Sequence, residues 1–99
     1  MTEAKLKELA KLLKVLSNAK RLRIFLCLFS GEKCVCDIYQ CLDLPQNLAS
    51  HHLGILQRSR LIVGRRQGKW IYYSLNKKFI RQTLKGFNTF TNKLTKNNC

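Results

Sequence analysis

Leucines recur at helical spacing through the first part of the chain, with lysines between them. This pattern predicts an amphipathic helix over residues 3–16, whose apolar face carries Leu6, Leu9, Leu13 and Leu16. A second helix, AKRLRIFLCLF, follows Ser17 and Asn18, which can cap its start. We expect the pair Ser30-Gly31 to end this helix, because glycine readily adopts the left-handed conformation that closes many helices.

Two shorter helical patterns come next, with a turn between them. The first predicted helix covers roughly residues 36–42, and the segment DLPQ, which contains Pro45, forms the turn. The second predicted helix, NLASHHLGILQRS, places Ala49, Leu53 and Leu56 on one stripe that would pack inward. Its remaining face is polar and is expected to lie on the surface.

The pattern changes to short runs of β-branched and aromatic residues after residue 60. LIVGRR and KWIYYSL are joined through Gln67-Gly68, which predicts a hairpin with a positive φ at Gly68. A helical period returns after Asn76 and places several apolar residues on one broad face: Phe79, Ile80, Leu84, Phe87 and Leu94.

This order of elements predicts a mostly α-helical fold with a small β-hairpin (α+β), a winged helix-turn-helix that occupies residues 1–99 as a single domain. Residues 34–58 would form the helix-turn-helix, and residues 61–75 the wing. The terminal helices, 1–16 and 77–96, carry more apolar surface than a small core can cover. We therefore expect them to form the interface of a homodimer.

The charge of the chain points to a polyanionic partner. Nineteen Lys and Arg residues against five acids give a net charge of +14, which is typical of proteins that bind nucleic acid and less often of those that bind anionic membranes. Apolar runs such as IFLCLF are too short to span a bilayer, and the N-terminal residues show no secretory signal. We expect a cytoplasmic protein without a membrane partner. No carboxylate pair, Cys-His-Asn set or phosphate-binding glycine loop is present, so an enzyme is not expected.

The polar face of the helix that follows Pro45 suits the base edges of a DNA major groove. It carries amide, hydroxyl and imidazole groups without acids, and Asn and Gln match the paired donor and acceptor of adenine. The hairpin adds basic residues at or beside its tip, where they can contact phosphates or the minor groove. The predicted DNA-binding residues are Gln46, Asn47, Ser50, His51, His52, Arg58, Arg65, Arg66, Gln67 and Lys69. His52 lies at the edge of the inward stripe, so packing there without contact to DNA is the alternative for this residue.

Three segments together resemble the ArsR/SmtB family of bacterial winged-helix metalloregulatory repressors. They are LSNAKRLRIFLCLFSGEKCVCDI, LPQNLASHHLGILQRSRLI and RRQGKWIYYSL, which span most of the chain. The motif CVCD resembles the thiolate box of members that sense arsenite, antimonite, cadmium or lead. The resemblance implies a homodimer that occupies double-stranded operator DNA without a cofactor. It also implies that As(III) or Sb(III), or alternatively Cd(II) or Pb(II), releases the protein from this DNA.

Five cysteines in a chain without an export signal favour metal ligands, redox groups or core residues over disulfides. Cys34 and Cys36 are the predicted metal ligands, but in an ideal helix they lie about 200° apart around the axis. They can share an ion only if Cys34 precedes the helix or the first turn opens, since bonds of about 2.3 Å bring two sulfurs within roughly 4–4.6 Å. We therefore predict that ion binding reshapes the start of the 36–42 helix, moves the next helix and lowers DNA affinity.

The third ligand is open, because Tyr39 stands where the arsenite box of the family has its third cysteine. Cys99 after the last helix is the preferred candidate, and Cys41 is the alternative. Cys41 lies about 10 Å from Cys34 along an intact helix, so its participation requires unwinding. Cys27 is expected in the core, where a free cysteine behaves as a small apolar residue.

Two alternative hypotheses also assign DNA binding to the chain but give its cysteines a role other than metal sensing. In the first, Cys27 and Cys99 form a redox or persulfide switch in a repressor of the same fold. In the second, the chain binds DNA non-specifically and its thiols are incidental, which would give a steep dependence on salt and no response to an inducer.

Overall fold

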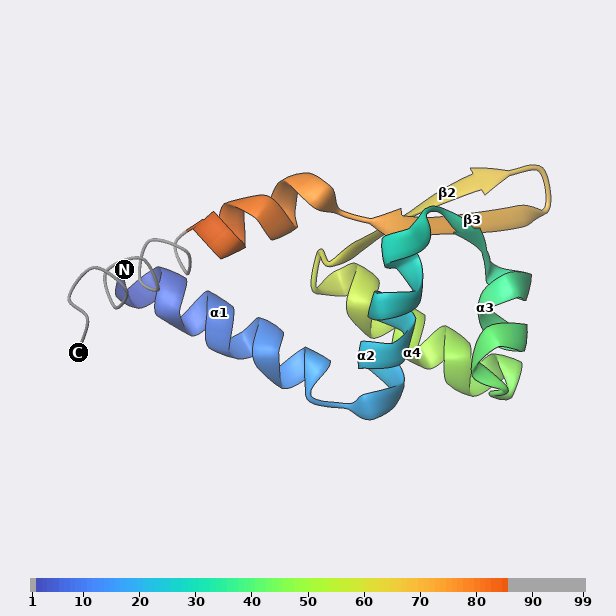
Figure 1. Cartoon of the computed structure of the whole chain (residues 1–99), viewed down its shortest axis with the longest axis horizontal. Helices are drawn as coiled ribbons and strands as arrows, with labels where there is room; N and C mark the ends of the chain where they lie inside the picture. Colours follow the sequence, from blue (N-terminus) through green and yellow to red (C-terminus); the bar gives the residue numbers. More distant parts are fainter. Residues whose placement is uncertain (1, 86–99) are drawn as a thin grey trace.

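The computed structural model describes residues 2–85 and shows three central helices, a three-stranded sheet and two outer helices (Figure 1). The elements in chain order are α1 (Glu3–Leu16), α2 (Ala19–Cys27), the 3₁₀ turn η1 (Leu28–Ser30), β1 (Lys33–Cys34), α3 (Val35–Leu42), α4 (Gln46–Arg58), β2 (Ile62–Gln67) and β3 (Trp70–Leu75). Residues 77–85 are again helical. The winged helix-turn-helix predicted from the order of patterns is confirmed.

Local capping explains where the early helices begin and end. The Asn18 side chain accepts hydrogen bonds from the backbone N–H groups of Lys20 and Arg21, at 3.0 and 3.2 Å, and so caps α2 as predicted. Helix α2 is shorter than predicted, because its last turn tightens into η1 before Gly31, whose φ is +130°. Asp43 ends α3 with a φ of +52°, a conformation that aspartate tolerates better than most residues.

The core lies where α2, α3 and α4 meet the sheet. Its fully buried side chains are Ile24, Ile38, Leu53, Leu56 and Ile62. The inward stripe predicted for α4 is confirmed, since its three apolar members are at most 1% exposed. This packing fixes which face of α4 points outward.

The sheet is antiparallel with the strand order β1-β3-β2. Strands β2 and β3 form the predicted hairpin, with Gln67 opposite Trp70 and a φ of +64° at Gly68. A positive φ at the first of two loop residues only is the pattern of a type II′ turn. Strand β1 was not predicted: it has two residues, Lys33 and Cys34, and exists only because they pair with Tyr73 and Tyr72 of β3.

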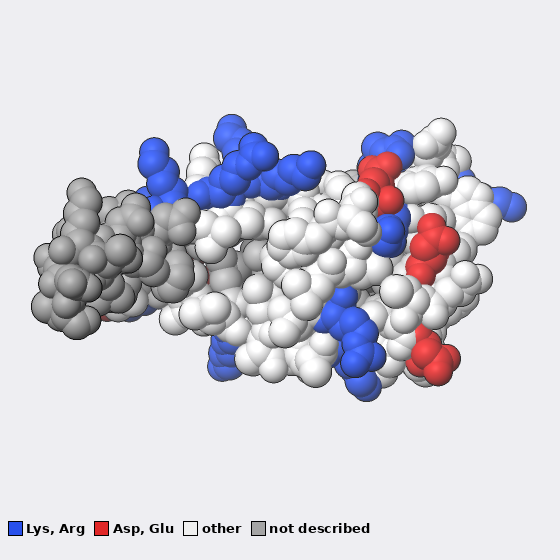
Figure 2. All heavy atoms as spheres, in the orientation of Figure 1, with Lys and Arg blue, Asp and Glu red and all other residues white. Residues whose placement is uncertain are grey.

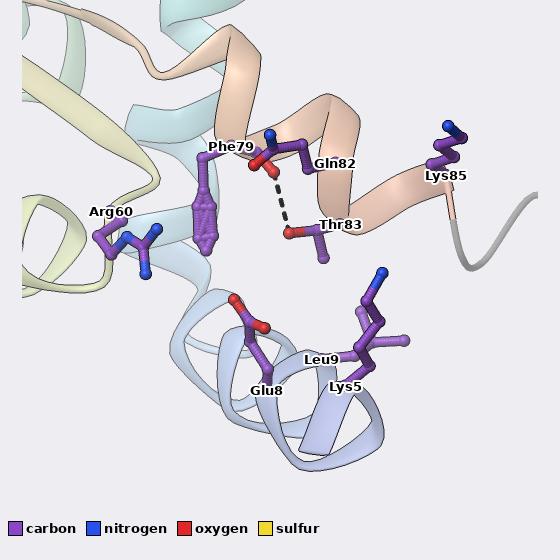
Figure 3. Close-up of a pocket in the computed structure, with 8 residues that line it drawn as sticks. All are labelled: Lys5, Glu8, Leu9, Arg60, Phe79, Gln82, Thr83 and Lys85. Carbon is purple, nitrogen blue, oxygen red and sulfur yellow. Dashed lines mark hydrogen bonds between the residues drawn. The ribbon is translucent and has the colours of Figure 1, made fainter. Parts of the chain in front are cut away.

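The two outer helices leave apolar residues uncovered. Leu6 and Leu13 of α1 are 51% and 59% exposed, and Leu84 is 46% exposed. A hollow of about 490 Å³ separates α1 from residues 77–85, with Arg60 and Phe79 at its inner end (Figure 3). The part of the predicted 77–96 helix beyond residue 85, with Phe87 and Leu94, lies outside the described residues. None of the helices described between residues 2 and 85 has the length and apolarity needed to cross a membrane.

Candidate nucleic-acid interface and thiol pairs

The first two turns of α4 present a polar, exposed surface. Gln46, Asn47, Ser50 and His51 are all exposed, because the buried Ala49 and its apolar neighbours hold the opposite face in the core. Arg58 is exposed at the far end of the same helix. The structure therefore brings five of the predicted DNA-binding residues of α4 to the surface.

The structure buries His52, which differs from its place among the predicted DNA-binding residues. Its side chain is only 5% exposed, and its Nδ1 lies 3.5 Å from Nη1 of Arg21 on α2. Burial and the nearby Arg21 lower the pKa of His52, so the ring stays neutral in the interior. A side chain in this position packs α4 against α2 and does not belong to the exposed side of α4.

The wing exposes Arg65, Arg66, Gln67 and Lys69, but the Arg65 side chain is already engaged. Its Nη2 and Nε donate to the two carboxylate oxygens of Glu32, at 2.7 and 3.2 Å, and its Nη1 donates to Oε1 of Gln67 at 2.9 Å. The hydrogen bond with Arg65 lowers the pKa of Glu32. Two of the four predicted wing residues, Arg65 and Gln67, thus participate in a surface network that also holds the segment just before Cys34.

Cys34 and Cys36 form a pair at the start of α3. Cys34 has extended backbone, with φ −65° and ψ 148°, and is the residue that precedes the first helical turn. Burial raises the pKa of the Cys36 thiol, and a hydrogen bond with Cys34 raises it further. The two thiols are therefore neighbours.

The start of α3 bears on how Cys34 and Cys36 could share an ion. The sequence leaves two conditions for their convergence, a Cys34 that precedes the helix or an opened first turn, and the first condition is met because α3 begins at Val35. Because Cys34 precedes the first turn of α3, that turn need not open for the two sulfurs to approach each other.

The segment that carries this first pair is joined to both predicted DNA-binding elements. The backbone of Cys34 is paired with Tyr72 of β3, the wing strand. On the next turn of α3, the Tyr39 hydroxyl lies 2.9 Å from Oγ of Ser50 on α4, within hydrogen-bond distance. Sequence reasoning noted Tyr39 only as a departure from the thiolate box, because helical spacing within one element carries no signal for a contact with another.

A second thiol pair lies between α2 and α3. Sγ of Cys27 is 3.7 Å from Sγ of Cys41, and Cys41 is exposed. Cys27 was predicted to be a core residue; it is half-buried at the edge of the core and contacts a thiol, so that expectation is wrong. Cys99, the preferred third ligand and the partner of Cys27 in the redox alternative, lies outside the described residues.

The two pairs do not merge into one larger cluster. Within residues 2–85, no three His, Cys, Asp or Glu side chains gather closely enough to hold a metal ion. Cys41, the alternative third ligand, is occupied with Cys27 rather than placed beside Cys34 and Cys36. The described part of the chain therefore offers two separate sites with two thiols each.

Charges are distributed unevenly over the surface. Three of the five acids, Glu32, Asp37 and Asp43, lie on or beside α3. Figure 2 shows acidic side chains over the end of the molecule that α3 occupies, and basic side chains over the helix that begins at residue 77. The thiol-bearing helix is thus the least basic part of a strongly basic chain, which favours the approach of a cation there.

The fold and the exposed polar helix beside a hairpin define a winged helix-turn-helix protein. A similar solved structure is the homodimeric winged helix-turn-helix DNA-binding domain of Mb0332 from Mycobacterium bovis, with a TM-score of 0.72 over 98% of this chain and 93% of that one. The sequence identity of 24% makes this a likeness of fold alone.

Sequence comparison gives the family. The model of the arsR family of bacterial regulatory proteins matches residues 18–63. An arsenical resistance operon repressor of Staphylococcus xylosus is 40% identical over 84% of this chain and 83% of its own length. An arsenical resistance operon repressor of Escherichia coli (strain K12) is 45% identical over 67% of this chain, which spans only 57% of that repressor. The chain belongs to the arsR family, a family of transcriptional regulators and not of enzymes.

Proposed function

We propose that the chain is a transcriptional repressor that binds operator DNA as a homodimer and is released when a thiophilic ion binds Cys34 and Cys36. Its relatives are named arsenical resistance operon repressors, which favours As(III) or Sb(III) as the inducer before Cd(II) or Pb(II). The single observation that carries the proposal is the position of Cys34. Its backbone belongs to the sheet of the wing, while its side chain lies at the start of the helix that packs on α4.

DNA recognition is assigned to the exposed side of α4. Gln46 and Asn47 carry side-chain amides suited to adenine, and Ser50 and His51 extend this surface by one turn. Arg66 and Lys69 of the wing would contact phosphates, which fix the register without reading sequence. A two-fold dimer places two copies of α4 on one side of the molecule, where they can enter successive major grooves.

The dimer would form through the outer helices. Leu6 and Leu13 of α1, together with Leu84, leave exposed apolar surface on the two outer helices, which lie on either side of the hollow shown in Figure 3. A second copy covering this surface would bury it and hold the two α4 helices at a fixed separation.

Release from DNA would begin with the thiols at the start of α3. A thiophilic ion displaces the protons of Cys34 and Cys36 and still lacks a third donor among the described residues. Completing the site with Cys99 or with Cys41 would pull on α3, β1 or the dimer interface. The strain would pass to the wing through β1 and to α4 through Tyr39 and Ser50, and a coupling of about 1–3 kcal/mol would weaken DNA binding 5- to 150-fold.

The test is a titration of a protein–DNA complex. The tightest duplex is selected from a random pool, and fluorescence anisotropy follows its release as arsenite, antimonite, Cd(II) or Pb(II) is added. We expect release from the natural chain and none from the Cys34→Ser, Cys36→Ser double variant, which should bind the duplex as tightly as before. Equal responses of the two proteins would show that the ion acts elsewhere. Absence of a preferred duplex would reject the repressor itself.

A further inference from the structure

We propose that Cys27 and Cys41 form a second, independent site, which binds a thiophilic centre with two open valences, such as an As(III) atom that carries one carbon substituent. The pair bridges two packed helices: Cys27 is the last residue of α2, and Cys41 lies in the last turn of α3. The exposure of Cys41 gives a reagent access, and the half-buried Cys27 lies directly beside it.

The distance between the sulfurs fits a bent centre. With bonds of about 2.3 Å, the 3.7 Å between the two Sγ atoms corresponds to an S–X–S angle of about 107°. Such an angle suits a pyramidal or tetrahedral atom, whereas a linear two-coordinate ion would need sulfurs about 4.6 Å apart. The two helices thus already hold the thiols at the spacing that the bound state requires, so little ordering free energy is spent on binding.

The number of donors selects the class of ligand. No third His, Cys, Asp or Glu among residues 2–85 joins this pair, so within this part of the chain an ion that requires three thiolates remains incompletely bound. An As(III) atom with one carbon substituent needs only two sulfurs. The pair therefore suits monosubstituted arsenicals better than free arsenite.

The chemistry balances without an oxidant. An organoarsenic oxide, R–As=O, reacts with two thiols to form two As–S bonds and one molecule of water, and arsenic stays trivalent. Burial and the neighbouring Cys41 raise the pKa of the Cys27 thiol, while Lys33 acts in the opposite direction. The two thiol protons leave with the oxygen as water, so the exchange needs no other reactant.

Occupation of this site should leave DNA binding unchanged. Cys27 and Cys41 already lie within bridging distance, so neither helix has to move. Neither residue belongs to the strand that pairs with the wing or to the contact between Tyr39 and Ser50. The site differs in this respect from the Cys34 and Cys36 pair.

The experiment uses phenylarsine oxide and a full-length chain with Cys34→Ser, Cys36→Ser and Cys99→Ser, in which Cys27 and Cys41 are the remaining thiols. Intact-mass spectrometry should show one phenylarsenic group per chain, with both thiols protected from alkylation. Excess monothiol should leave the adduct in place and a dithiol should remove it. The reason is that a monodentate thiol competes poorly with a chelate formed by two protein thiols. Additional Cys41→Ser, at an exposed position, should abolish this protection while circular dichroism stays unchanged.

Three results would overturn the inference. The first is the absence of an adduct that resists monothiol. The second is an equal adduct after Cys41→Ser. The third is release of the selected duplex when phenylarsine oxide binds the background variant, which would contradict the independence of the site. Loss of the arsenite response in the Cys34→Ser, Cys36→Ser variant is a separate measurement, so the proposed repressor and the second site can fail independently.

Discussion

Helix α3 carries one cysteine of each thiol pair, Cys36 near its start and Cys41 near its end. A comparison of the two ends separates the ability to bind a ligand from the ability to transmit that binding to DNA. At its start, Cys36 lies beside Cys34, whose backbone is hydrogen-bonded into the sheet of the wing. At its end, Cys41 contacts Cys27 of α2, and this contact involves neither the wing nor α4. The functional groups are identical, but Cys34 of the first pair is itself part of the wing sheet, whereas the contact of the second pair joins only α2 and α3.

The difference shows that thiol geometry alone does not make a sensor. The sulfurs of the second pair already lie 3.7 Å apart, so binding there would only reinforce an existing contact. The first pair lies where a displacement changes both the strand that supports the wing and the helix that contacts Ser50. A ligand shifts a conformational equilibrium only by its differential affinity for the two states, so the responsive site is the one whose completion changes the structure.

The largest effect is expected from Ile38, the fully buried residue of α3 that lies between the two pairs. Ile38→Ala should lower the free energy of unfolding by about 2–4 kcal/mol, because it removes core contacts and leaves a cavity. Urea unfolding followed by circular dichroism measures this loss.

The exposed neighbour provides the control for Ile38. Gln40→Ala should change stability by less than about 0.5 kcal/mol. If both variants behave alike, α3 is not held by its core face, and the comparison of its two ends loses its basis.

A smaller effect is expected from the contact between Tyr39 and Ser50. Tyr39→Phe removes one hydroxyl of a surface hydrogen bond and should cost about 0.5–1.5 kcal/mol of stability. It should also raise the concentration of inducer needed to release DNA, since it cuts one link from the first pair to α4.

A double-mutant cycle isolates this contact. Tyr39→Phe and Ser50→Ala should be non-additive in unfolding free energy, whereas Tyr39→Phe and Cys41→Ser should be additive. Additivity in the first cycle would mean that the two hydroxyls do not communicate and that α3 influences α4 by another route.

The ion pair between Glu32 and Arg65 lies close in sequence to Cys34, at the start of α3, and it gives a prediction about DNA affinity. Glu32→Gln should free Arg65 for a phosphate, so that DNA affinity rises about two- to fivefold at low salt. The slope of log K against log salt should steepen by about 0.9 if one phosphate contact is gained.

Anisotropy titrations at several salt concentrations measure the effect of Glu32→Gln. Asp43→Asn, which removes an acid near the other end of α3, is the matched control and should change the slope less. An unchanged slope after Glu32→Gln would show that Arg65 contacts no phosphate.

The smallest predicted effect is a pH dependence from His52. Burial, and then Arg21, lower the pKa of this ring in the folded chain, so the unfolded chain binds a proton more readily in the interval between the two pKa values. The stabilising contribution is present above the unfolded pKa of about 6.5 and is lost as pH falls through that interval.

The two adjacent histidines allow a matched measurement without DNA. Thermal unfolding at pH 7.5 and 5.5 should show a smaller difference for His52→Gln than for the natural chain, because the neutral amide does not titrate. His51→Gln, at an exposed position, should retain the natural difference. If only His51→Gln changes the pH dependence, the buried ring is not its source.

The sequence by itself determined the order of elements and the surfaces of α4. Leucine spacing, the Asn18 cap and the hairpin signal at Gly68 each involve only a few consecutive residues, so they can be recognised without knowledge of the fold. The inward stripe of α4 and the exposure of Gln46, Asn47, Ser50 and His51 follow from the same short-range periodicity. His52 lies at the edge of that stripe, where periodicity does not distinguish the two faces, and its packing against Arg21 of α2 places it in the interior.

Only the tertiary structure decided which distant residues meet. Strand β1 forms because β3 offers free backbone groups, and Glu32, Tyr39 and Cys27 find Arg65, Ser50 and Cys41 on other elements. These contacts depend on how the elements pack, so they cannot be predicted from a local sequence pattern. The cysteine motif CVCD could be read along the chain, but the pairing of Cys27 with Cys41 required α2 and α3 to be placed side by side.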